Sequence, residues 1–168
     1  MSAHLLSLIV AAPALAAVAV MFLPTSARLA IRVVSLVGAL ASLGGSVYAL
    51  ASYDRRAGGF QFVEDYPLVP SLGVHLTLAL DGWAGPLLLL TGVIIVAGVL
   101  ASWNLANRER EYFVLLLVLV AGGFGVFVAQ DLMVFFLFYE IAVLPMYLLI
   151  GIWGASHAVP SAGPFARV

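Results

Sequence analysis

The sequence predicts an all-α integral membrane protein with about five transmembrane helices and one small β-hairpin. The first observation behind this prediction is composition: 64% of the 168 residues are hydrophobic and 9% are charged, whereas roughly a quarter of a soluble domain is charged. The second is that the apolar residues gather in five long stretches. So little charge excludes a water-soluble globule, a disordered segment and a nucleic-acid-binding protein.

Each apolar stretch is long enough to cross a membrane as a helix. A bilayer core of about 30 Å needs roughly 20 apolar residues at about 1.5 Å per residue. Residues 1–154 are therefore predicted to form one transmembrane helical domain, and residues 155–168, rich in Gly, Pro, Ala and Ser, a short flexible tail. The expected spans are residues 5–23, 29–51, 83–103, 112–129 and 132–153.

Small residues recur at intervals of four in the second and fourth spans. They are Gly38, Ser42 and Ser46, with Ala41, Gly45 and Ala49 beside them, and Ala121, Gly125 and Ala129. Small side chains let helix backbones approach closely in lipid, where the hydrophobic effect does not drive helices together. This spacing predicts close helix–helix contacts, and the general richness of membrane helices in Gly and Ala is the alternative explanation.

The connection over residues 52–82 predicts the hairpin. From Val74 to Leu80, apolar residues alternate with His75, Thr77 and Ala79, which is the period of a half-buried strand. The residues expected to form turns in this segment are Pro67, Pro70 and Gly73.

The basic residues predict how the helices are oriented. The chain has no Lys, so all seven basic residues are Arg. Because basic residues concentrate on the cytoplasmic side of a membrane, we expect the N-terminus and the hairpin on the outer side, which is the periplasm in a bacterium. One side of the five spans carries Arg28, Arg32, Arg108, Arg110 and Arg167, and the other side carries Arg55 and Arg56.

The residue types present limit the chemistry of the chain. Cys is absent, which excludes disulfides, thiolate-held zinc, iron–sulfur clusters and thiol nucleophiles. His4, His75 and His157 fall in separate loops, so we expect no metal site. The charged run 108–111 is expected to be a solvated turn or a docking contact with a neighbour. Because the chain has no Cys and no expected metal site, any redox centre is expected in another subunit.

Glu140 is the candidate functional residue. It lies about nine residues, hence about 13 Å, inside the fifth span. An ionised carboxylate alone at that depth costs roughly 2.5 to 3.5 kcal/mol, so the side chain must be protonated or paired. Removal from water raises the proton affinity of a carboxyl group and a nearby cation lowers it, so we expect a proton relay. The alternative is a neutral, hydrogen-bonded crosslink between helices. Because every Arg lies in or beside a loop, we expect another chain to supply a cation.

Four further residues are expected to support these helices. Pro145 leaves the carbonyl of Ile141 without a helical donor, which predicts a kink and a free acceptor for water. Tyr139 is a candidate for lining a proton path, and ordinary packing is the alternative. Asp131 and Asp81 precede the fifth and third spans, where each side chain is expected to cap free N–H groups.

Five blocks in the second half of the chain carry a family resemblance. They are Leu-Asp-Gly at 80–82, Leu-Leu-Thr-Gly at 89–92, Ala-Ser-Trp at 101–103, Arg-Glu-Arg-Glu-Tyr-Phe at 108–113 and the long run 131–154, which begins Asp-Leu-Met-Val-Phe-Phe and ends Gly-Ile-Trp-Gly. In these blocks the sequence resembles the proton-pumping membrane subunit of respiratory complex I, called chain M in bacteria and chain 4 in mitochondria. Residues 1–79 fit the first two helices and outer hairpin of that family by pattern only.

The resemblance implies a role for Glu140 and a set of partners. In the family, the glutamate of the last block belongs to a half-channel for protons and is paired with a lysine on a later helix. By position that glutamate is Glu140. The resemblance also implies that NAD, FMN, iron–sulfur clusters and quinone are bound by partner subunits, and that this chain binds no cofactor. Expected partners are the lipid bilayer, the other membrane subunits of complex I and a chain that supplies the later helices, which the family has after the position of Gly154.

The expected function is therefore that of a membrane subunit of a proton-translocating NADH:quinone oxidoreductase in the inner (plasma) membrane of a cell, without redox chemistry of its own. Multisubunit cation/proton antiporters and membrane-bound hydrogenases share the fold and are one alternative. Phe-Tyr-Glu at 138–140 and Leu-Pro-Met-Tyr at 144–147 favour the complex I subunit. A non-pumping scaffold or truncated remnant is the other alternative.

Overall fold

The computed structural model describes residues 4–69, 74–105 and 108–154, and it contains five helices that are long and apolar enough to cross a membrane. The predicted all-α membrane fold is therefore confirmed. The largest difference from the expected bounds is in α4, which begins at Glu109 rather than at 112. The helices are α1 (Leu5–Phe22), α2 (Arg28–Ser52), α3 (Ala84–Ala101), α4 (Glu109–Val128) and α5 (Leu132–Trp153).

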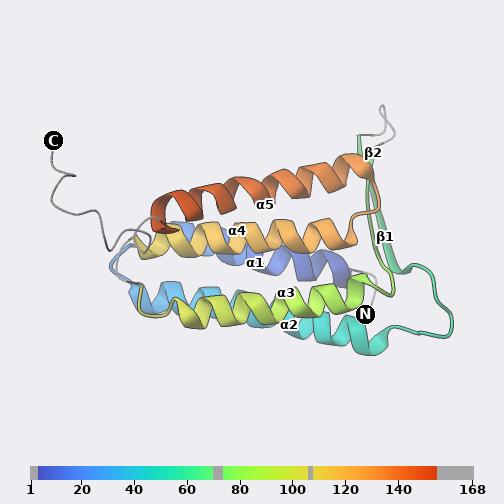
Figure 1. The fold of residues 1–168 in the computed structure, drawn as a ribbon, viewed down its shortest axis with the longest axis horizontal. Helices are drawn as coiled ribbons and strands as arrows, with labels where there is room; N and C mark the ends of the chain where they lie inside the picture. Colours follow the sequence, from blue (N-terminus) through green and yellow to red (C-terminus); the bar gives the residue numbers. More distant parts are fainter. Residues whose placement is uncertain (1–3, 70–73, 106–107, 155–168) are drawn as a thin grey trace, which may run out of the picture.

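The helices lie side by side along the longest axis of the molecule, with the hairpin across one end (Figure 1). Helix α1 packs on both α2 and α4, α2 packs on α3, and α5 packs on α4. The largest side chains of the shared core are Phe113 and Phe124 of α4, which are fully buried. Helix α5 is the least buried of the five helices.

The contact between α1 and α2 depends on small residues. A Cβ atom added at Gly38 would overlap Ala16, and one added at Gly45 would lie 2.6 Å from a side-chain carbon of Ile9. The hydroxyl of Ser42 donates a hydrogen bond across the contact to the carbonyl of Ile9 at 3.0 Å. This carbonyl is the one that Pro13 leaves without a helical donor. The predicted small-residue contact of the second span is confirmed.

The contact between α4 and α5 depends on two glycines. A Cβ atom at Gly125 would overlap the ring of Phe138, and one at Gly122 would lie 2.7 Å from the backbone nitrogen of Ala142. A Cβ atom at Gly123, on the same helix, would meet nothing within 4 Å. The predicted close approach at Gly125 is therefore confirmed, and Gly122 extends it.

The hairpin consists of β1 (Gln61–Val69) and β2 (Val74–Leu80), paired antiparallel. The alternating segment is confirmed as a strand, and Leu78 and Leu80 are buried. Pro67 is not in the turn as predicted, because it lies within β1 opposite His75; residues 70–73 lie outside the described residues. The hairpin also contacts the connection between α4 and α5, since the backbone nitrogen of Gln130 donates a hydrogen bond to the carbonyl oxygen of Thr77 at 2.9 Å.

Candidate functional site

Helix α5 has one face against α4 and one face that the described chain leaves uncovered. Only Val134 and Pro145 of this helix are buried. On the other side lies an exposed row that we call the open face of α5. It consists of Met133, Phe136, Glu140, Leu144 and Tyr147, whose spacing of three and four residues places them along one side of a helix. The open face is therefore apolar and aromatic with a single acid in its middle.

Glu140 is exposed on this open face. In the described part of the chain, no hydrogen bond or ion pair reaches its carboxyl group. Without a partner, a charge at this position in lipid is unfavourable by roughly 2.5 to 3.5 kcal/mol. The alternative of a crosslink to a neighbouring helix is not realised among the described residues.

The structure places the supporting residues at separate positions of α5. Pro145 is buried on the side that faces α4. Tyr139 is 48% exposed, and its ring stacks on that of Phe135 with 6.5 Å between ring centroids. Asp131 is the N-cap residue of the helix and accepts hydrogen bonds from the backbone nitrogens of Met133 and Val134 at 2.8 and 3.3 Å. None of these three makes a contact with Glu140 that the structure records as a hydrogen bond or ion pair.

Asp81 lies at the start of α3. Its Oδ1 accepts hydrogen bonds from the backbone nitrogens of Trp83 and Ala84 at 3.0 and 2.6 Å. These are N–H groups that a helix leaves free at its start. The carboxylate therefore satisfies donors at the positive end of the helix.

Glu64 is a buried acid that no sequence pattern singled out. It is 4% exposed and lies on β1. Its two carboxylate oxygens accept hydrogen bonds from the backbone nitrogens of Leu6 and Ser7 at 2.8 and 3.1 Å, and the hydroxyl of Ser7 also donates to it. Glu64 therefore caps the first turn of α1 from a distant strand. No local sequence pattern joins positions so far apart.

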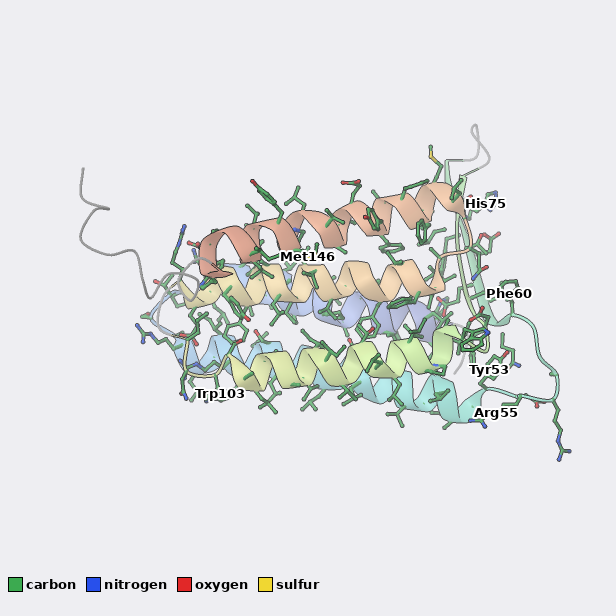
Figure 2. All side chains as sticks on the ribbon, viewed as in Figure 1. Tyr53, Arg55, Phe60, His75, Trp103 and Met146 are labelled. Atoms are coloured by element: carbon green, nitrogen blue, oxygen red, sulfur yellow. The ribbon has the colours of Figure 1, made fainter. Side chains whose placement is uncertain are left out.

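Glu109 is a second buried acid, and here the expectation of a solvated turn is wrong. It is 6% exposed and forms an ion pair with Arg32, whose guanidinium also lies over the ring of Trp103. Arg108 and Glu111 of the same run are exposed and pair with each other at 2.7 Å. Helix α4 begins at Glu109 rather than at 112. Glu109 is therefore part of the helix and pairs with Arg32 near the start of α2. Figure 2 places Trp103 and Arg55 at opposite ends of the bundle.

The hairpin carries an exposed cluster of three polar side chains, Asp65, His75 and Thr77. Asp65 accepts a hydrogen bond from the hydroxyl of Thr77 at 2.7 Å and lies 3.1 Å from Nδ1 of His75. The Thr77 hydroxyl, followed by the His75 ring, holds the pKa of Asp65 below its ordinary value. Within residues 4–69, 74–105 and 108–154, no group of three or more His, Cys, Asp and Glu side chains is placed to hold a metal ion.

The chain is similar in sequence to several known proteins. No protein-family model matches it. It is 41% identical over 150 residues to NAD(P)H-quinone oxidoreductase chain 4 1 of Nostoc sp. (strain PCC 7120), covering 89% of this chain and 28% of that protein. It is 44% identical over 161 residues to the protein of the same name in Synechococcus sp. (strain JA-3-3Ab), covering 95% of this chain and 30% of that protein. The chain is a relative of the N-terminal part of NAD(P)H-quinone oxidoreductase chain 4.

Two solved structures contain chains with a similar fold. The fold matches a chain of respiratory complex I from Thermus thermophilus with a TM-score of 0.70 and 26% identity, covering 91% of this chain and 29% of that chain. It also matches a chain of an archaeal membrane-bound sulfane sulfur reductase with a TM-score of 0.69, and the 23% identity there supports the fold alone. The chain thus spans about 30% of the length of the chain 4 relatives.

Proposed function

We propose that the chain is a membrane subunit of a proton-translocating NAD(P)H:quinone oxidoreductase, in which Glu140 forms part of a proton half-channel. The observation that carries this proposal is an acid in the middle of a 22-residue apolar helix, on a face that the described chain leaves open. The identity of 41–44% to proteins named NAD(P)H-quinone oxidoreductase chain 4 supports the assignment to this enzyme.

The chemistry follows from the surroundings of the carboxyl group. The ionised form of any carboxyl group is poorly solvated in an apolar environment. A cation brought near a carboxyl group favours its ionised form. The open face of α5 is where helices from another chain, or from sequence beyond this one, supply that cation. Proton uptake and release then depend on the distance between the two groups.

The proposal includes partners and location. The other membrane subunits of the complex cover the open face of α5, and NAD, FMN, iron–sulfur clusters and quinone belong to partner subunits. The chain lies in the inner (plasma) membrane with its N-terminus in the periplasm. The arginine count supports this orientation: Arg28, Arg32, Arg108 and Arg110 lie at one end of the bundle, and Arg55 and Arg56 follow α2 at the other.

The test is Glu140→Gln in the complete complex reconstituted into sealed vesicles. Glutamine keeps the size of the side chain and removes the titratable group, so we expect proton translocation per electron to fall while the complex still assembles. Asp54→Asn, an exposed acid in the connection after α2, is the matched control and leaves the ratio unchanged. An unchanged proton-to-electron ratio in Glu140→Gln contradicts the role of Glu140.

Two further readouts separate the other functions. If Glu140→Gln abolishes sodium or potassium movement rather than redox-coupled proton movement, the chain belongs to a cation/proton antiporter. If Glu140→Gln has no effect and Gly125→Leu prevents assembly, the chain is a scaffold, because Gly125 contacts the ring of Phe138 across α4 and α5. Gly123→Leu, which meets open space, controls for the added side chain.

A further inference from the structure

A polar cavity lies at the arginine-rich end of the bundle. Its volume is about 140 Å³, and since one water needs roughly 10–15 Å³ of such space, it admits a group much larger than a water. Three arginines against two glutamates leave one excess positive charge on its walls, which favours an anion. The lining residues are Thr25, Arg28, Arg108, Glu109, Arg110 and Glu111.

The guanidinium groups of this cavity have donors to spare. An arginine side chain carries five N–H donors. Arg108 uses its Nε on Glu111 at 2.7 Å, and Arg110 donates from Nη1 to a backbone carbonyl at 3.3 Å. Arg28 is 62% exposed and its Nε lies 3.9 Å from Glu109. Several N–H groups are therefore available to an anion with more than one oxygen, such as a phosphate.

One wall residue of this cavity, Glu109, carries a buried acceptor that lacks a donor. The side chain of Glu109 is 5% exposed, and its Oε1 accepts from Nε of Arg32. Its Oε2 has no hydrogen-bond donor in the part of the chain that the structure describes. A buried carboxylate oxygen without a donor is unfavourable. The complementary ligand therefore carries a hydrogen-bond donor beside its anionic group.

A second, apolar cavity lies beside the polar one and shares two wall residues with it. It has a volume of about 330 Å³, and the shared residues are Arg110 and Glu111. Its other walls are apolar side chains of α1, α4 and α5, among them Met21, Val114 and Leu148. A ligand that occupies both cavities thus has a charged end at the helix termini and an apolar part along the helices.

We propose that the two cavities bind one phospholipid of the surrounding bilayer, with a headgroup that carries both a phosphate and a hydrogen-bond donor. The phosphate binds the guanidinium groups of Arg28, Arg108 and Arg110. The donor, a hydroxyl in phosphatidylglycerol or an ammonium in phosphatidylethanolamine, binds Oε2 of Glu109. An acyl chain lies in the apolar cavity against Met21. The charged walls of the polar cavity match the headgroup of a lipid, and the walls of the apolar cavity match its acyl chain.

The test is the binding of phosphatidylglycerol to the full chain in detergent, followed by native mass spectrometry. We expect one retained lipid per chain, and at least about tenfold weaker binding in R28Q/R108Q, because charge-assisted hydrogen bonds are lost. The matched control R55Q/R56Q changes the same residue type at the other end of the bundle and keeps wild-type binding. Thermal unfolding in detergent without added lipid checks that both double variants are folded.

Three results would overturn the proposal. The first is equal binding of phosphatidylglycerol by the wild-type chain and by folded R28Q/R108Q. The second is equal binding of phosphatidylcholine, whose headgroup has a phosphate but no donor for Glu109. The third is equally tight binding of glycerol 3-phosphate, which would show that the cavity takes a free phosphate and that the apolar cavity contributes nothing. Weaker phosphatidylglycerol binding in Leu148→Phe, which puts a larger side chain into the wall of the apolar cavity, supports the lipid.

Discussion

Ser42 of α2 donates its hydroxyl hydrogen to the backbone carbonyl of Ile9 in α1, at 3.0 Å. In a regular helix this carbonyl accepts from residue 13, but residue 13 is proline and has no N–H. The side chain of one helix therefore completes the backbone bonding of another. Ser42 is fully buried, so no water or lipid can take its place.

Replacing Ser42 with Ala should destabilise the chain by about 1–2 kcal/mol, because the carbonyl of Ile9 then lacks a donor. Ser46 is an equally buried control whose hydroxyl bonds only the Ser42 carbonyl of its own helix. Ser46→Ala should cost less. The free energy of unfolding in mixed micelles measures both, and equal losses would contradict the cross-helix explanation.

Replacing Gly125 with Ala should destabilise the packing of α5 on α4 by about 1–3 kcal/mol, because the added methyl group overlaps the ring of Phe138. Gly123→Ala should be neutral or stabilising, because its methyl group meets no atom within 4 Å and Ala favours helix. Unfolding of the two variants in the same micelles gives the comparison. A loss in Gly123→Ala as large as that in Gly125→Ala would refute the packing model.

Replacing Glu64 with Ala should destabilise the start of α1 by about 1.5–3 kcal/mol, because backbone N–H groups lose a charged acceptor. Amide hydrogen exchange at Leu6 and Ser7 should accelerate most, which locates the effect. Glu64→Gln keeps one acceptor oxygen and should lose less. Unchanged exchange at these amides would show that the carboxylate does not cap the helix.

Removing one member of the buried pair Glu109 and Arg32 should be more harmful than removing one member of the exposed pair Arg108 and Glu111. Glu109→Ala leaves a largely buried guanidinium without its partner, a loss of about 3–5 kcal/mol. Glu111→Ala affects side chains that are 59% and 45% exposed, and exposed pairs contribute about 0–1 kcal/mol. Thermal unfolding of both variants distinguishes the two cases.

The hairpin should weaken in acid because of Asp65. Its pKa in the folded chain lies below the ordinary 3.8, owing first to Thr77 and then to His75. The ionised form therefore stabilises the fold at pH values above 3.8, and this contribution is lost as the pH falls through the lowered pKa. The protection factors of the β2 amides, which compare their exchange with that of an unfolded chain at the same pH, should fall in this range, and Asp65→Asn should remove this pH dependence. A hairpin whose protection factors follow the same pH profile in both proteins would contradict it.

The helices could be predicted from sequence because the length of an apolar stretch is enough to identify a membrane-spanning helix. Twenty consecutive apolar residues have no alternative in a bilayer, and the period of two from Val74 to Leu80 was sufficient for β2. The small-residue contacts at Gly38 and Gly125 also followed, since close approach in lipid requires small side chains.

The buried acids could not be predicted in the same way. Glu64 and Leu6 are 58 residues apart, and Glu109 and Arg32 are 77 residues apart. Their pairing depends on which helices become neighbours, which the apolar pattern leaves open. Glu140 was recognisable because its depth in the span is a property of one segment. The exposure of the open face of α5 could not be predicted, because it depends on how the other helices pack.

The hairpin has a mechanical consequence for α5. Strand β1 holds the first turn of α1 through Glu64, and β2 is bonded to the connection between α4 and α5 through Thr77 and Gln130. A piston-like displacement of α5 along its axis must therefore either break the bond to Thr77 or pull on α1. The tether leaves bending and side-chain rotation as the motions open to the region around Glu140 without that cost.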